Sequence, residues 1–165
     1  MRKGFWTLIV LTATSIPFNA FAASDEDSLG EISDHLGTVN AWRLIPSVLL
    51  VPCAKESPQK ADAMREIYNS WSQSNESLIA SIDRVLDQVV PLHANAFAVS
   101  NSEAKNRIVA ITTKMIVDAY FKNEKITVAQ VCADYDKIVA GLSSPGRTAT
   151  TRGLVYAVEG LVGLW

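Results

Sequence analysis

The chain has 165 residues, of which 48% are hydrophobic and 19% are charged, and its formal net charge at pH 7 is −2. This mildly acidic balance argues against a nucleic-acid partner, which requires a basic surface to neutralise phosphates, and against electrostatic docking on anionic lipid. Only two cysteines and two histidines are present, which limits metal-binding and nucleophilic chemistry.

Residues 1–22 have the pattern of a Sec-type signal peptide. Arg2 and Lys3 precede an uncharged apolar run over residues 5–16, and small residues occupy the −3 and −1 positions of a cleavage site after Ala22. The run is shorter than the ~20 residues that usually span a bilayer. We therefore expect cleavage rather than anchoring, and a location in the periplasm or further outside the cell.

Residues 23–165 are predicted to form one all-helical domain. Removal of the two signal-peptide cations leaves a net charge of 13 − 17 = −4. Cys53 and Cys132 are expected to form a disulfide, since this is the default for an even cysteine count in an oxidising compartment. A redox pair would favour C-x-x-C spacing and a zinc site would need further Cys or His ligands, and the sequence has neither.

The first part of this domain is predicted to be irregular. Residues 24–34 are acidic and polar, typical of a loose entry or a short first helix. Residues 39–54 are dense in apolar side chains but contain Pro46 and Pro52. Because proline removes a helical hydrogen bond and clashes with the preceding turn, we expect short helical pieces broken near both prolines, ending close to Cys53.

The clearest helical pattern covers residues 58–90. Ser57 is a good N-cap residue, Pro58 suits the first helical position, and Pro91 is predicted to close the element. Apolar residues recur at helical spacing, at Met64, Tyr68, Trp71, Leu78, Ile82, Val85 and Val89. Either one long helix or two helices meeting at residues 72–77 fit this pattern, and its unbroken phase favours one helix.

Two further helices follow a predicted loop over residues 92–103. Ser100 and Glu103 form a possible capping box for a helix that ends near Phe121, with its apolar stripe at Ala104, Ile108, Ile111, Met115 and Ala119. Thr127 and Gln130 form a second capping box, which begins a helix whose buried stripe is expected to include Cys132 and to extend to Leu142.

Residues 143–152 are predicted to form a polar loop, with Arg147 and Arg152 available for a carboxylate or phosphate partner. Beyond the loop, residues 153–165 have apolar side chains on one helical face. These 13 residues extend about 20 Å as a helix, less than the thickness of the bilayer core. We expect a last helix packed in the core, with docking into a partner's groove as the alternative.

No constellation of residues indicates catalysis, and no cofactor or metal is expected. Glu31 and His35 have the i, i+4 spacing of a metal-ligand pair, but a third ligand is not indicated. Asp83 and Asp87 also have this spacing, yet they lie off the apolar stripe and are expected to face solvent rather than to act as an acid–base pair. The patterns of nucleophilic serines and phosphate-binding loops are absent.

Asn75 interrupts the apolar stripe between Trp71 and Leu78. A buried amide needs hydrogen-bond partners and can fix the register of neighbouring helices. One interpretation is a satisfied amide at a bend in the helix. The other is a ligand or partner site beside Trp71, so that Trp71, Asn75, Arg147 and Arg152 are the candidate contact residues.

These patterns predict an all-α bundle of about four to five helices with one disulfide. In general outline, such a domain resembles the helical periplasmic immunity proteins of bacterial antagonism systems. We expect a non-enzymatic periplasmic protein that binds another protein as an inhibitor, immunity factor or chaperone. The first alternative is a carrier of a small apolar ligand, with a cavity lined by Trp71, Met115 and Tyr135. An enzyme with a dispersed site is the second alternative.

Overall fold

The computed structural model of the chain describes residues 26–122 and 126–163. The predicted signal peptide, its cleavage site and Trp165 lie outside the described residues. The elements are, in chain order, α1 (Glu26–Glu56), the 3-10 turn η1 (Pro58–Lys60), α2 (Ala61–Ser74), α3 (Glu76–Phe97), α4 (Asn101–Phe121), α5 (Val128–Ala133), α6 (Tyr135–Leu142) and α7 (Pro145–Val162). Within this part of the chain there is no strand, so the predicted all-α fold is confirmed. The seven α-helices exceed the predicted four to five.

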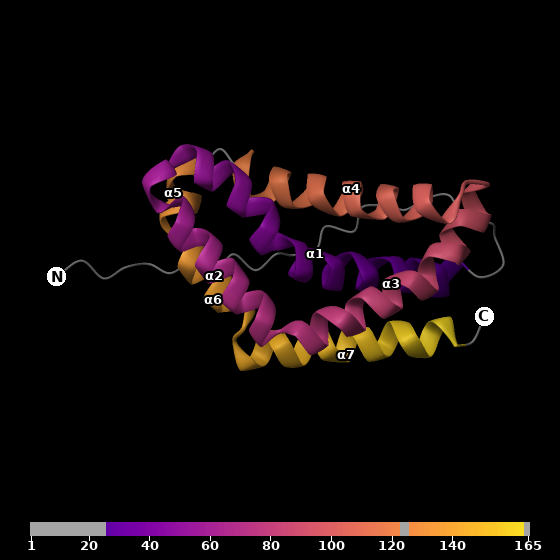
Figure 1. Cartoon of the computed structure of the whole chain (residues 1–165). Helices are drawn as coiled ribbons and strands as arrows, with labels where there is room; N and C mark the ends of the chain where they lie inside the picture. Colours follow the sequence, from indigo (N-terminus) through magenta and orange to yellow (C-terminus); the bar gives the residue numbers. More distant parts are fainter. Residues whose placement is uncertain (1–25, 123–125, 164–165) are drawn as a thin grey trace.

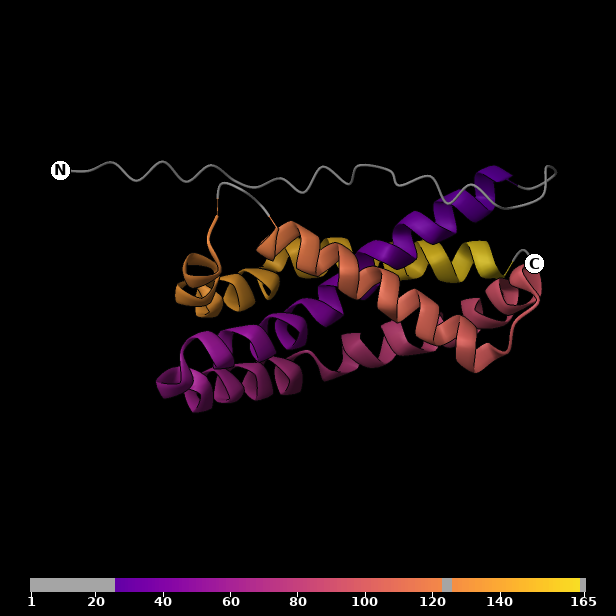
Figure 2. The same ribbon diagram turned by 90° about the horizontal axis from the view of Figure 1, so that it is seen from above.

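Helix α1 is the centre of the molecule and packs against every other described helix. Helix α4 lies on one side of it, and α3 and α7 lie on the other (Figure 1). Seen from above, α4 crosses over α1 at an angle (Figure 2). This crossing positions the candidate site described below.

The predicted breaks at Pro46 and Pro52 are wrong, because both prolines lie inside the continuous helix α1. A proline inside a helix costs about 3 kcal/mol, and burial of the surrounding residues offsets this. Val39, Leu49 and Cys53 are fully buried, as is Pro46 itself. The Pro46 carbonyl also accepts a hydrogen bond of 3.0 Å from the hydroxyl of Tyr135.

The favoured single helix over residues 58–90 is also wrong. The helix is interrupted at Asn75, which lies between the end of α2 and the start of α3. The Asn75 side chain donates to the carbonyl of Trp71 (2.8 Å), and its own backbone carbonyl accepts from the N–H groups of Leu78 and Ile79. A side-chain amide that bonds to the backbone in this way competes with helix continuation.

Helix α3 continues through Pro91 to Phe97, so Pro91 does not end it. Pro91 has no N–H to donate to the carbonyl of Asp87, four residues earlier. Both residues are exposed, so water can bond to this carbonyl instead. Burial of His93 and Ala94 holds the last turns of α3 in place. The predicted loop is reduced to residues 98–100.

Helix α4 begins and ends as predicted, and the Ser100 hydroxyl accepts a 3.2 Å bond from the Glu103 backbone. The Glu103 carboxylate pairs with Arg107 rather than completing the capping box. The buried stripe differs from the predicted one, because it comprises Ala104, Ile108, Thr112 and Ile116. The side chains of Ile111 and Met115 are instead 39% and 40% exposed.

The capping box of Thr127 and Gln130 is complete. The single helix predicted after it is divided at Asp134 into α5 and α6, and the Asp134 carboxylate pairs with Lys137 in the first turn of α6. Aspartate favours such helix ends because its side chain competes for local hydrogen bonds. The predicted disulfide is confirmed, and Cys53 of α1 and Cys132 of α5 are both buried.

The polar loop predicted over residues 143–152 is wrong, because α7 begins at Pro145, which occupies its first turn. The Thr148 and Thr150 hydroxyls donate to the carbonyls four residues earlier, so these polar side chains are satisfied within the helix. Further along, Val155 and Val158 are buried, and α7 packs against α1, α3 and α6.

One stretch of the described residues, Ile32–Glu56 in α1, is long and apolar enough to cross a membrane by length and composition. The core helix of a soluble protein passes the same test. The central position of α1 accounts for its apolar composition.

Candidate functional site

Two of the four predicted contact residues, Trp71 and Asn75, lie in the interior where α2 meets α3. They are 5% and 8% exposed. The Trp71 ring packs at 5.0 Å from the ring of Trp42, and the Asn75 amide donates to the Trp71 carbonyl and to the Ser143 hydroxyl. Asn75 is thus a hydrogen-bonded amide at a helix junction. The two side chains offer little surface to a partner.

The Trp71 indole nitrogen is buried and has no hydrogen-bond partner among the described residues. The neighbouring Trp42 indole differs, since it donates to the carbonyl of Leu142 at 3.0 Å. Tyr135 of α6 is also buried, and burial raises the pKa of its hydroxyl to about 12. A phenol with this pKa stays protonated and donates to Pro46, so it is unsuited to act as a base.

The other two predicted residues, Arg147 and Arg152, are exposed on α7. Arg147 lies near Tyr120 of α4. Burial raises the pKa of Tyr120, and the positive charge of Arg147 opposes this rise. Arg152 lies on the part of α7 that precedes the exposed Tyr156. Trp71 and Asn75 are therefore buried at the junction of α2 and α3, whereas Arg147 and Arg152 face solvent on α7.

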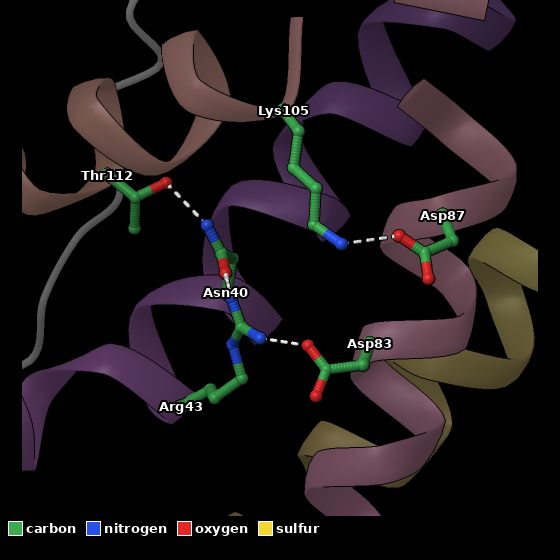
Figure 3. A network of polar contacts seen from close by, with 6 residues as sticks. All are labelled: Asn40, Arg43, Asp83, Asp87, Lys105 and Thr112. Carbon is green, nitrogen blue, oxygen red and sulfur yellow. Dashed lines mark hydrogen bonds and ion pairs between the residues drawn. The ribbon is translucent and has the colours of Figure 1, made fainter. Parts of the chain in front are cut away.

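A polar network holds α1, α3 and α4 at their crossing (Figure 3). The buried Asn40 donates to the Thr112 hydroxyl at 3.0 Å and accepts a 2.9 Å bond from Arg43, which also forms an ion pair with Asp83. Nearby, Lys105 pairs with Asp87 at 2.6 Å.

Asp83 and Asp87 are 45% and 62% exposed at their side chains. Each carboxylate pairs with a cation from a different helix, Asp83 with Arg43 of α1 and Asp87 with Lys105 of α4. Their geometry indicates a structural role at the crossing.

No group of three or more His, Cys, Asp or Glu residues that could hold a metal occurs in the part of the chain that the structure describes. The side chain of Glu31, which has i, i+4 spacing to His35, lies outside that part. His93 is 9% exposed, and its ring packs in a tilted arrangement against the ring of Phe97, with 4.5 Å between the ring centroids. Burial, and secondarily the charge of Arg107, lowers the pKa of His93.

The first apolar recess lies between α1, α3 and α4, beside His93. Its free volume is about 50 Å³, well below the roughly 150 Å³ that holds a benzene molecule in an engineered cavity. The exposed Ile111 and Met115 line it, whereas Trp71 and Tyr135 do not. The residues expected to line a carrier cavity are thus not brought together.

The second recess, the α1–α4 groove, lies beyond the crossing, between the C-terminal halves of α1 and α4 and the start of α5. It is a shallow groove, more open than enclosed, with a volume of about 510 Å³. The hydroxyl-bearing residues Ser47 and Thr113 contribute to its walls. Its apolar lining consists of Val48, Val51, Pro52, Val117, Phe121 and Val128.

Val51 gives the α1–α4 groove its most accessible apolar side chain, with 74% of its surface exposed. Of the four exposed large hydrophobic side chains in the described residues, Val51, Ile111 and Met115 lie on α1 and α4, and Tyr156 lies on α7. Sequence reasoning missed Val51, because it stands in an apolar segment that reads as core throughout.

Comparisons with known protein families, with curated proteins and with solved structures find no match to this chain. The candidate site therefore rests on the geometry of the groove.

Proposed function

We propose that this chain is a non-enzymatic periplasmic protein that binds another protein, as an inhibitor, immunity factor or chaperone, through the α1–α4 groove. The observation that carries the proposal is the open apolar groove itself, with Val51 exposed in its wall. Large contiguous apolar surface that is open to water commonly marks an interaction site.

Burial of Val51 against a partner would contribute favourably to the free energy of binding. Moving a side chain of valine size from water into an apolar contact contributes about 1.5–3 kcal/mol when the burial is complete, and Val51 is 74% exposed before binding. Because the α1 backbone is held by its buried surroundings and by the disulfide at Cys53, the groove wall is preformed. A preformed wall reduces the entropy cost of association.

A carrier of a small apolar ligand is the second candidate, because the volume of the groove falls in the range of roughly 300–1,000 Å³ found for ligand pockets. Its shape favours a protein instead. Ligand pockets bury about 70–90% or more of the ligand surface, whereas the wall at Val51 faces solvent. A protein partner covers the open side itself.

The periplasmic location is supported by the buried disulfide and by the predicted signal peptide together. A disulfide forms and persists in an oxidising compartment. The test of location is the intact mass of protein from a periplasmic extract, which should lack residues 1–22.

The experiment that tests the binding surface compares two matched surface variants. Val51→Gln changes the groove, while Tyr156→Gln changes an equally accessible side chain on α7, where exposure is 70%. Each tagged variant is cross-linked in periplasm of the native host, purified, and analysed by mass spectrometry. We expect a partner that the wild type and Tyr156→Gln retain and that Val51→Gln loses.

Two results would contradict the proposal. Equal recovery of partner by Val51→Gln and the wild type would exclude the groove, and loss only in Tyr156→Gln would move the interface to α7. A fluorescent fatty acid distinguishes the carrier, since saturable binding that Val51→Gln weakens, without any cross-linked protein, would favour the second candidate.

A further inference from the structure

Three exposed lysines follow lining residues of the α1–α4 groove closely in the sequence. Lys55 is exposed and lies one helical turn beyond Val51 on α1. Lys114 of α4 and Lys122, the residue that follows α4, are exposed and directly follow the groove residues Thr113 and Phe121 in sequence. We call Lys55, Lys114 and Lys122 the basic rim.

The acidic groups beside the basic rim are fewer and partly neutralised. Asp118 accepts ion pairs from Lys114 (2.6 Å) and Lys122 (2.7 Å), and these hydrogen bonds lower the pKa of its carboxyl group. Glu56 is the exposed neighbour of Lys55. Arg147 adds a further cation near the end of α4, because its charge opposes the rise that burial causes in the pKa of Tyr120 there.

The local charge is therefore positive, although the whole chain has a net charge of −2. Like charges across an interface are unfavourable and opposite charges steer association. The rim thus favours a partner surface with carboxylates around an apolar centre.

The backbone of the groove limits how a partner segment can sit. Every wall belongs to a helix, and the described residues have no strand edge onto which an extended peptide could add. The α4 wall runs from Thr113 to Phe121, a rise of about 12 Å at 1.5 Å per residue, or roughly two helical turns. An amphipathic helix matches this length with side chains at i, i+3, i+4 and i+7.

We infer that the α1–α4 groove receives an amphipathic helix of the partner protein, whose apolar face lies in the groove and whose flanks carry Asp or Glu opposite the basic rim. This inference rests on the proposed function and specifies the chemistry of the partner at the same site.

Three synthetic helices serve as probes, each of about 15 residues and lactam-bridged because shorter free helices are marginal in water. All three share a leucine face, and their flanking positions are Glu, Gln or Lys. Binding to the intact mature protein is measured by fluorescence anisotropy at low and high salt. We expect the Glu helix to bind most tightly, by roughly two- to fivefold for each lysine that it engages, and its advantage to shrink at high salt.

Variants locate the effect. The double variant Lys55→Gln, Lys122→Gln should remove most of the preference for the Glu helix, while Arg152→Gln, an exposed cation on α7, should leave it unchanged. Both variants change only exposed side chains, and circular dichroism confirms that each is folded.

Equal affinity for the three helices would overturn the inference of an acidic partner. The same holds if Arg152→Gln reduces the preference for the Glu helix as much as the double lysine variant does. The groove itself would then be judged by Val51→Gln, which should weaken all three helices alike. If none of the helices binds, the helical mode of binding is refuted, and the cross-linking comparison of Val51→Gln with Tyr156→Gln decides the proposed function independently.

Discussion

The bond between Cys53 and Cys132 ties the central helix to a helix of only six residues, α5. An isolated helix of that length is not stable in water, so α5 depends on its attachment to α1. Replacing both cysteines with alanine removes the bond without leaving a free thiol. The substitution removes a link from the folded structure and also removes the restriction that the disulfide places on the unfolded chain.

The magnitude follows from the length of the loop that the bond closes. The cysteines are separated by 79 residues in sequence. Closing a loop of this length removes enough entropy from the unfolded chain to stabilise the fold by about 4.5 kcal/mol at 25 °C in the chain-entropy model. The total free energy of unfolding of a domain of this size is about 5–15 kcal/mol. The double variant should therefore lose about 30% of its stability or more, and its Tm should fall by about 15 °C.

Urea unfolding followed by circular dichroism measures the difference between the oxidised wild type and the Cys53→Ala, Cys132→Ala variant. The slope of the unfolding free energy against urea should also rise, because the unlinked chain exposes more surface when it unfolds. The wild type under reducing conditions is the control for the substitutions. A loss below about 1 kcal/mol would refute the entropic reasoning and show that the unfolded chain keeps these segments together.

Two further predictions concern α7 and His93. Val158 is fully buried, so Val158→Ala should lower the free energy of unfolding in urea by about 2 kcal/mol. Tyr156→Ala changes an exposed site and should alter that free energy by no more than about 0.5 kcal/mol. Equal effects of the two substitutions would contradict the packing of α7 in the core. The pKa of His93 is lowered in the folded state, so the unfolded chain binds the proton more readily and stability falls as the pH drops below the unfolded value of about 6.5. His93→Gln should reduce the loss of Tm between pH 7 and pH 5, and an unchanged loss would show that His93 does not contribute.

Local signals in the sequence predict several features well. The cap at Ser100 and the capping box at Thr127 are formed by residues three positions apart, so no distant part of the fold is needed to specify them. The disulfide is predictable because the cysteine count leaves one pairing. The wide apolar stripe of residues 58–90 is confirmed as well, since Ile82 and Val85 are fully buried.

Helix boundaries depend on contacts that a local pattern does not contain. Pro46 stays inside α1 because that helix is buried among all the others and Tyr135, 89 residues away, bonds to its carbonyl. Asn75 ends α2 although the apolar phase continues, and its second partner is Ser143 of a distant segment. Propensity alone is a weak guide where tertiary burial decides.

The sequence by itself determined the helical class, the cysteine pairing and the residues available for chemistry, because these follow from composition and from spacing along a helix. Only the tertiary structure decided which apolar residues stay in contact with water. Leu49 and Val51 are two positions apart in one apolar segment of α1, yet they are 0% and 74% exposed. Residues two positions apart along a helix point to nearly opposite faces, so what the tertiary structure decides is that the face with Leu49 is covered by other helices while the face with Val51 lies open at the groove.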